Sequence, residues 1–141
     1  MKSMTEELFS NRRNFSEEDE WRVIGWLALK GSSWTNEIAE TLEYDLEAIK
    51  ALIRTLLKRE WIFRVTIDAN NPSPFVMCRL SELHSKGITQ MKQFEERNFY
   101  ALTEEGFERY AIKFKGHHKR ANNCYLRYVT PIENNTKMIS L

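Results

Sequence analysis

Hydrophobic residues recur at helical spacing in the first part of the chain. Ser16 stands where a helix N-cap is expected, Asp19 lies at the capping-box spacing, and the neighbouring acidic residues suit the positive end of a helix dipole. We therefore predict a helix that runs to about Lys30. Its apolar residues lie on more than one side, which indicates that two faces of the helix are covered. They are Trp21, Val23, Ile24, Trp26, Leu27 and Leu29.

Two further helices follow, separated by a tight turn at Glu43 and Tyr44. The first is expected over about residues 35–42. The second, which Asp45 can cap, is expected over about residues 46–59. Their apolar positions recur at three- and four-residue steps and predict a shared core. It consists of Ile38, Ala39, Ile49, Ile53 and Leu56.

Apolar residues then alternate with polar ones instead of following a helical period. Residues 61–67 predict a strand, and residues 75–80 predict the strand that returns. Between them, residues 68–74 are rich in Asp, Asn and Pro, which is typical of a loop. Together these segments predict a β-hairpin.

The remaining pattern is mixed. Residues 81–96 are expected to be partly helical, with an interruption near Gly87, and residues 98–102 predict a short strand. Thr103 is then expected to cap a last helix, because one apolar stripe follows it at three- and four-residue steps. The stripe consists of Phe107, Tyr110, Ala111 and Phe114. Beyond this helix only residues 124–130 look like a strand.

Composition indicates the general class of protein. The chain has 141 residues, of which 42% are hydrophobic and 29% charged, as in a single globular domain. It has no run near the ~20 apolar residues that cross a bilayer, and its polar start has no signal-peptide core. The two cysteines, Cys78 and Cys124, form no paired motif, so we expect two thiols in a reducing compartment. These features predict a soluble, cytoplasmic protein.

Charge is divided unevenly along the chain. Residues 1–110 hold 15 Lys and Arg against 19 Asp and Glu, a balance of −4, whereas residues 111–141 hold 6 against 1, a balance of +5. A basic segment on an acidic body suggests contact with a polyanion such as nucleic acid. Tyr125 and Tyr128 could stack on bases there. A solvated tail is the alternative.

Two stretches resemble a known family. Residues 34–62 resemble the helix-turn-helix of MarR- and PadR-like transcription regulators, with Ala39 where that family has a small residue at the helix crossing. Residues 100–106, YALTEEG, are similar to its Leu-Thr-x-x-Gly signature, in which Gly106 would permit close packing. The resemblance implies an α+β, mostly α fold, namely a winged helix-turn-helix with a β-hairpin wing and extra terminal segments.

The chain is accordingly expected to have three parts. These are an N-terminal arm (1–15), a winged-helix domain (16–115) and a basic C-terminal segment (116–141). The resemblance implies a DNA-binding transcriptional regulator. The helix from Leu46 would dock in the major groove of double-stranded DNA, and the hairpin would touch the backbone. The expected DNA-binding residues are Lys50, Arg54, Arg64, Lys119 and Arg120. Apolar residues on both sides of the first helix further predict a homodimer built from terminal helices.

Some residues depart from the family pattern. Asp45 and Glu47 at the tip of the second helix would repel phosphates, and Leu52 and Leu57 stand where the family usually has polar residues. The alternative function is therefore a winged-helix protein–protein interaction module, in which these leucines and the tryptophans contact a partner. Arg79, on the expected return strand, is a further candidate for phosphate contact.

Motifs for chemistry are missing from the sequence. It has no Gly-rich phosphate loop, no Ser or Cys nucleophile motif and no His-Glu pair at metalloprotease spacing. We therefore expect neither an enzyme nor a bound metal or cofactor.

Overall fold

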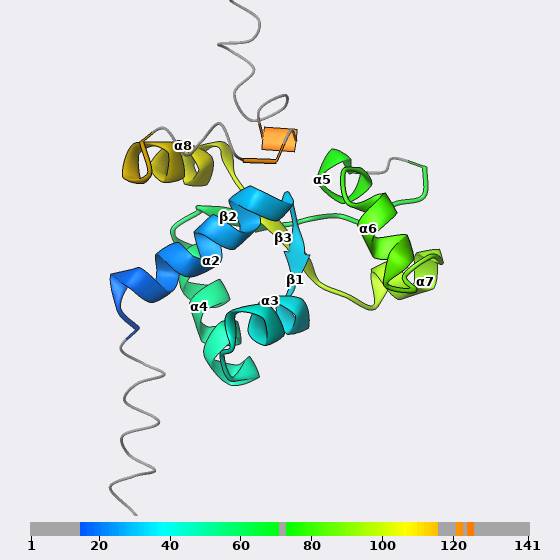
Figure 1. Cartoon of the computed structure of the whole chain (residues 1–141), viewed down its shortest axis with the longest axis horizontal. Coiled ribbons are helices and arrows are strands. Elements are labelled where there is room, and N and C mark those ends of the chain that lie inside the picture. The colour runs from blue at the N-terminus through cyan, green and yellow to red at the C-terminus, as the bar shows by residue number, and fades with distance from the viewer. Residues whose placement is uncertain (1–14, 71–72, 116–120, 123, 126–141) are drawn as a thin grey trace, which may run out of the picture.

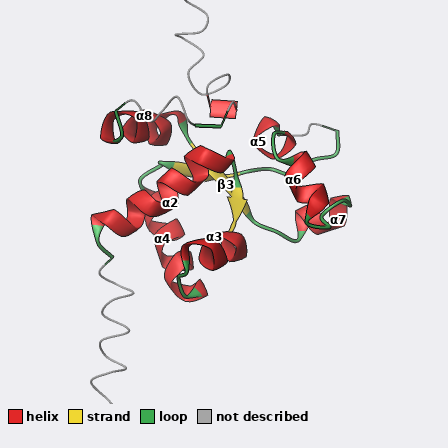
Figure 2. Cartoon of the chain, viewed as in Figure 1, coloured by secondary structure: helices red, strands yellow, loops and turns green. Residues whose placement is uncertain are grey.

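The structure is a computed structural model of the chain, and it describes residues 15–70, 73–115, 121–122 and 124–125. Helices cover most of these residues and surround a small antiparallel sheet (Figures 1 and 2). This α+β, mostly α, composition agrees with the expected fold class. The elements are α2 (Glu17–Lys30), β1 (Ser33–Trp34), α3 (Thr35–Leu42), α4 (Leu46–Lys58), β2 (Ile62–Arg64), α5 (Pro74–Met77), α6 (Leu80–Ser85), α7 (Met91–Glu95), β3 (Phe99–Leu102) and α8 (Glu104–Lys113).

Helix α2 is central in the fold. The predicted capping box is present: Asp19 N–H donates to Ser16 Oγ, and Ser16 N–H donates to the Asp19 carboxylate at 3.0 Å. The helix contacts α3, α4, β3 and α8. Most of its apolar residues are therefore covered within the chain, as the two-sided pattern predicted, although Leu29 is 53% exposed.

Helices α3 and α4 meet as predicted. Glu43, at the end of α3, adopts a left-handed conformation with φ of 61° and turns the chain into α4. The predicted shared core is confirmed, because each of its members is at most 6% exposed. These are Ile38, Ala39, Ile49, Ile53 and Leu56.

Strand β3 is the middle strand of the sheet, whose order is β1-β3-β2 with both pairs antiparallel. It confirms the short strand expected over residues 98–102. On β2, Arg64 pairs with Tyr100 of β3. Strand β1 was not expected, because two residues are too few to show an alternating pattern. Its Trp34 packs edge-on against Phe99, with ring centroids 5.3 Å apart.

The predicted hairpin is wrong in its second strand. Residues 75–80 fall in α5, a turn and the start of α6, and β2 pairs with β3 instead. Ser73 caps α5 and Pro74 occupies its first turn, both typical helix starts. A short apolar run after such a start cannot be told from a strand by its pattern alone. Residues 65–98, here called the insertion, thus carry three short helices between paired strands.

The interruption expected at Gly87 is confirmed. The chain leaves α6 at Ser85, passes Gly87 with φ of 86°, and re-enters a helix at Met91. The insertion is therefore a chain of short helices whose shape depends on packing against the rest of the protein.

A buried ion pair holds the insertion against α3. Arg79 is 2% exposed, and its two terminal nitrogens donate to the Glu37 carboxylate at 2.5 and 2.8 Å. Arg79 also donates to the Ser32 carbonyl at 2.9 Å, beside β1. The Lys86 ammonium lies 2.8 Å from the Glu37 carboxylate and is its second cationic partner. The Glu82 carboxylate lies 3.1 Å from the Arg79 guanidinium. Arg79 is therefore a structural residue, and its expected phosphate contact is wrong.

The C-terminal segment contributes to the core. Tyr125 is fully buried and stacks on Phe107 of α8, with ring centroids 5.3 Å apart. Its hydroxyl donates to the Gly31 carbonyl at 2.6 Å and accepts from Leu102 N–H at 2.9 Å. Tyr125 is therefore unavailable for stacking on bases, and the core extends past the expected domain boundary at residue 115.

Helix α8 starts as predicted, with the Thr103 hydroxyl accepting from Gly106 N–H at 3.0 Å. Gly106 is needed for a close approach, because a Cβ there would lie 2.0 Å from the carbonyl oxygen of Trp61. The clash would be with backbone atoms, so it can be relieved only if α8 moves away from the start of β2.

We expect Gly106→Ala to lower the free energy of unfolding by ~1–3 kcal/mol or more, through overpacking. Gly25→Ala is the matched control: it lies inside α2, where an added Cβ meets nothing within 4 Å. It should raise stability by roughly 0.5–1 kcal/mol, because alanine is the better helix former. Urea denaturation measures both. A neutral or stabilising Gly106→Ala would contradict the close approach.

We expect Arg79→Met to cost about 3–5 kcal/mol, because it leaves the buried Glu37 carboxylate without its main partner. Burial alone raises the pKa of Glu37, but hydrogen bonds from Arg79, Lys86 and Ser33 outweigh it and place the pKa below 4.5. The stability that Glu37 contributes is therefore full above about pH 4.5 and falls as pH drops through the lower folded-state pKa.

Denaturation measured from pH 7 to pH 3 tests this dependence, and Glu37→Gln should remove that part of the acid loss. Arg109→Met is the control, since Arg109 is 54% exposed on α8, and it should change stability by less than about 0.5 kcal/mol. An Arg79→Met protein as stable as this control would show that the ion pair does not hold the insertion.

Candidate nucleic-acid interface

The exposed face of α4 carries a stripe of basic residues. Lys50 and Arg54 are exposed, as expected, and Lys58 continues the same face one turn further. The sequence pattern contained Lys58 at the i+4 position, but the prediction missed it. Ala48 is only 6% exposed and does not belong to this face.

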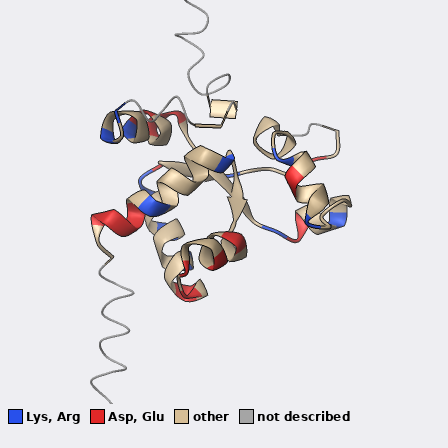
Figure 3. Cartoon of the chain, in the orientation of Figure 1, with Lys and Arg blue, Asp and Glu red and all other residues tan. Residues whose placement is uncertain are grey.

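Acidic groups offset the stripe at the start of α4. Lys50 Nζ lies 3.4 Å from the Glu47 carboxylate, and both side chains are about half exposed. Asp45 is the N-cap residue of the helix. Figure 3 shows further acidic positions on the neighbouring α3. The positive charge of α4 therefore lies mainly toward its C-terminal half, at Arg54 and Lys58.

Arg64 is exposed on β2, as its predicted role requires. It lines a hollow of ≈ 420 Å³ together with Glu95 and Arg97, which belong to the end of the insertion. This hollow lies where β2 leads into the insertion and where the insertion leads toward β3. A polymer bound in this hollow would contact the guanidinium groups of Arg64 and Arg97 and the carboxylate of Glu95.

Arg97 was not predicted as a site residue, and it connects the two parts of the surface. It lines the hollow beside Arg64 and also a larger one of ≈ 850 Å³, which Lys50 lines from α4. Its guanidinium lies over the Trp34 ring, 5.4 Å from the centroid, and donates to the Gln93 carbonyl at 2.6 Å. No motif could have indicated this residue, because its position depends on how the insertion folds.

The larger hollow is built by three segments. The starts of α3 and α4 form its walls, and residues 96–98 close it as the chain approaches β3. Trp34, the N-cap residue of α3, also lines this hollow and makes no side-chain cap. Lys50 and Arg97 are balanced by Glu40 and Glu96. The hollow is therefore polar and carries as many carboxylates as cations.

Two expected site residues, Lys119 and Arg120, lie outside the described residues. Lys50, Arg54 and Arg64 are therefore the expected site residues that the structure can place. Lys50 and Arg64 lie on adjoining hollows, and Arg54 is one turn along α4 from Lys50.

The apolar patch expected for a protein partner on α4 is wrong. Leu52 is fully buried in the core, and Leu57 packs against the same core while partly exposed. Large exposed hydrophobic side chains in the described part of the chain are scattered over four helices. They are Leu29 on α2, Met77 on α5, Met91 on α7 and Ile112 on α8.

Other kinds of site find no support in the described residues. Among them, no group of three or more His, Cys, Asp and Glu side chains is arranged to hold a metal ion. None of the helices they form is long and apolar enough to span a membrane. No protein-family model, no curated protein and no solved structure matches the chain. Function is therefore inferred from the geometry of the chain itself.

Proposed function

We propose that this protein is a DNA-binding transcriptional regulator of winged-helix type, acting in the cytoplasm. The helix-turn-helix of α3 and α4, followed by the antiparallel strands β2 and β3, supports the proposal because the helix-turn-helix is a DNA-binding motif. In this reading α4 is the helix that enters the major groove. The insertion takes the place of the usual hairpin wing.

One observation carries the proposal: Arg97 lines both hollows and so joins Lys50 to Arg64 on one continuous surface. Phosphates spaced along a DNA strand can meet these cations in turn, while Arg54 faces the base edges. Because Asp45 and Glu47 oppose a close approach of the α4 tip, phosphate contacts supply most of the affinity. Sequence preference is correspondingly modest.

The test measures duplex binding by fluorescence anisotropy against salt concentration. Arg64→Gln should weaken binding to all sequences alike and lower the salt slope by about one unit, because a phosphate contact is lost. Arg54→Gln should cost ~1–3 kcal/mol on a preferred duplex, and less on others, because a base contact is lost. Glu47→Gln should tighten binding, since it removes a charge that repels phosphate.

Arg109→Gln is the charge-matched control for this test. Arg109 is exposed on α8 and lines neither hollow, so its loss should leave the salt slope unchanged. The proposal is overturned if the full-length protein binds no duplex at ~50 mM salt, where non-specific contacts are strong. It is also overturned if Arg64→Gln and Arg109→Gln weaken binding equally.

The homodimer remains a prediction. The apolar excess that suggested it is largely covered within the chain, because α2 contacts four other elements and Phe107 and Tyr110 of α8 are buried. A dimer on DNA would place two copies of α4 on half-sites about one helical turn apart. Sedimentation tests this: a single species at the 16.8 kDa monomer mass at micromolar concentration without DNA, and a complex of one protein copy per duplex with DNA, would contradict it.

A further inference from the structure

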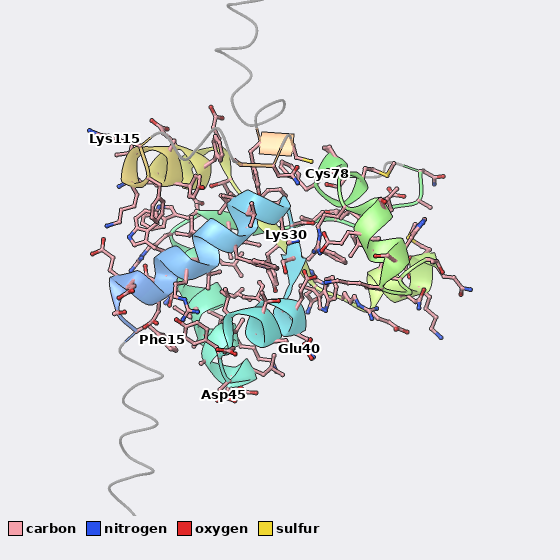
Figure 4. All side chains as sticks on the ribbon, in the orientation of Figure 1. Phe15, Lys30, Glu40, Asp45, Cys78 and Lys115 are labelled. Atoms are coloured by element: carbon pink, nitrogen blue, oxygen red, sulfur yellow. The ribbon has the colours of Figure 1, made fainter. Side chains whose placement is uncertain are left out.

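The two cysteines are far apart in the sequence but lie side by side in the fold. Cys78 ends α5 and is exposed, whereas Cys124 is buried in the C-terminal segment. Their thiols donate to carbonyls of successive residues: Cys78 to Phe75 at 3.4 Å and Cys124 to Pro74 at 3.0 Å. Both thiols therefore lie against the first turn of α5. Figure 4 shows Cys78 beside the short C-terminal turn.

The surroundings of Cys78 favour its thiolate. Its pKa is below the ordinary value, first because of the hydrogen bond from Cys124, partly opposed by burial, with the charge of Arg79 adding to the effect. The thiolate is the form of cysteine that reacts with oxidants. An exposed, activated thiol next to a buried second thiol is the arrangement in which the first reacts and the second resolves.

We propose that Cys78 and Cys124 form an intramolecular disulfide when the protein meets a peroxide. The bond would tie the C-terminal segment to the insertion. Because the two thiols lie on the carbonyls of adjacent residues, side-chain rotation can bring the sulfur atoms to disulfide geometry. The proposal stands independently of DNA binding.

The reaction proceeds in two balanced steps. The Cys78 thiolate attacks one oxygen of hydrogen peroxide and the O–O bond breaks. The hydroxide that leaves takes up the proton given up by Cys78, which yields Cys78 sulfenic acid and water. The Cys124 sulfur then attacks the sulfenic sulfur, the S–O bond breaks, and hydroxide leaves with the Cys124 proton as a second water. The two thiols lose two electrons and two protons, and the peroxide is reduced.

Asn122 already joins the described part of the C-terminal segment to the end of α2 without the disulfide. Asn122 donates from its side chain to the Lys30 carbonyl at 3.0 Å and from its backbone to the Ala28 carbonyl at 2.8 Å. Gly31 lies between the two parts, since a Cβ there would be 2.8 Å from Cys78 Sγ and 3.2 Å from Asn122 Cγ. The disulfide would therefore join parts that already touch, and would hold the end of α2 between them.

The experiment treats the purified full-length protein with hydrogen peroxide and then with an alkylating agent under denaturing conditions. Intact mass should fall by about 2 Da, with no alkylation, and peptide mapping should find Cys78 linked to Cys124. Dithiothreitol should restore both thiols. The oxidised protein should melt about 5 °C or more above the reduced one, because the bond restricts the unfolded chain.

Two variants separate the roles of the thiols. Cys124→Ser should stop at a sulfenic acid on Cys78, which a dimedone-type reagent captures. Cys78→Ser should leave the mass unchanged, because Cys124 is buried. The proposal is overturned if wild-type Cys78 goes on to sulfinic acid while Cys124 remains alkylatable, or if the disulfide forms between chains. Equal melting temperatures of the oxidised and reduced protein would overturn the proposed tie.

Discussion

Arg79 lies almost fully buried between the insertion and α3, with both terminal nitrogens on the Glu37 carboxylate and a third bond to the Ser32 carbonyl. The pair joins α3 to the insertion, which the backbone connects through α4 and β2. Burying a charged group costs free energy unless the group is fully paired. Removing one partner leaves the other charge buried and unpaired, which destabilises the fold. This contact, together with the ring packing of Phe75 on Phe63 and of Phe94 on Phe99, therefore fixes the position of the insertion, and with it of Arg97 and both hollows. Lys86 and Glu82 extend the network to the surface.

The parts of the fold that could be predicted are those with local signals. Ser16 and Thr103 are caps whose hydrogen bonds involve residues three positions away, and the core of α3 and α4 follows from helical spacing. The second strand of the hairpin could not be predicted, because its short apolar run fits a helix equally well once Ser73 and Pro74 start one. Arg79 looked like a surface cation, since its partner Glu37 is 42 residues away in the chain.

The residues of the candidate site also divide into those that the sequence could predict and those that it could not. Lys50, Arg54 and Arg64 could be assigned to exposed positions because a helix face and a strand face follow from period alone. Arg97 could not, because it reaches the surface between α4 and β2 only through the folding of the insertion. Tyr125 was misread because an aromatic residue in a basic stretch gives no sign of a buried hydrogen bond to Leu102 and Gly31. Long-range contacts thus decide the details of the site.

The ends of the insertion lie on paired strands, with Arg64 opposite Tyr100. In evolutionary terms, such an insertion can lengthen or shorten without changing the sheet, since the sheet constrains only its two ends. Glu37 limits this freedom, because its carboxylate is buried against a guanidinium that the insertion itself supplies. Any change in the insertion that moves Arg79 away must therefore also replace Glu37 or open it to water.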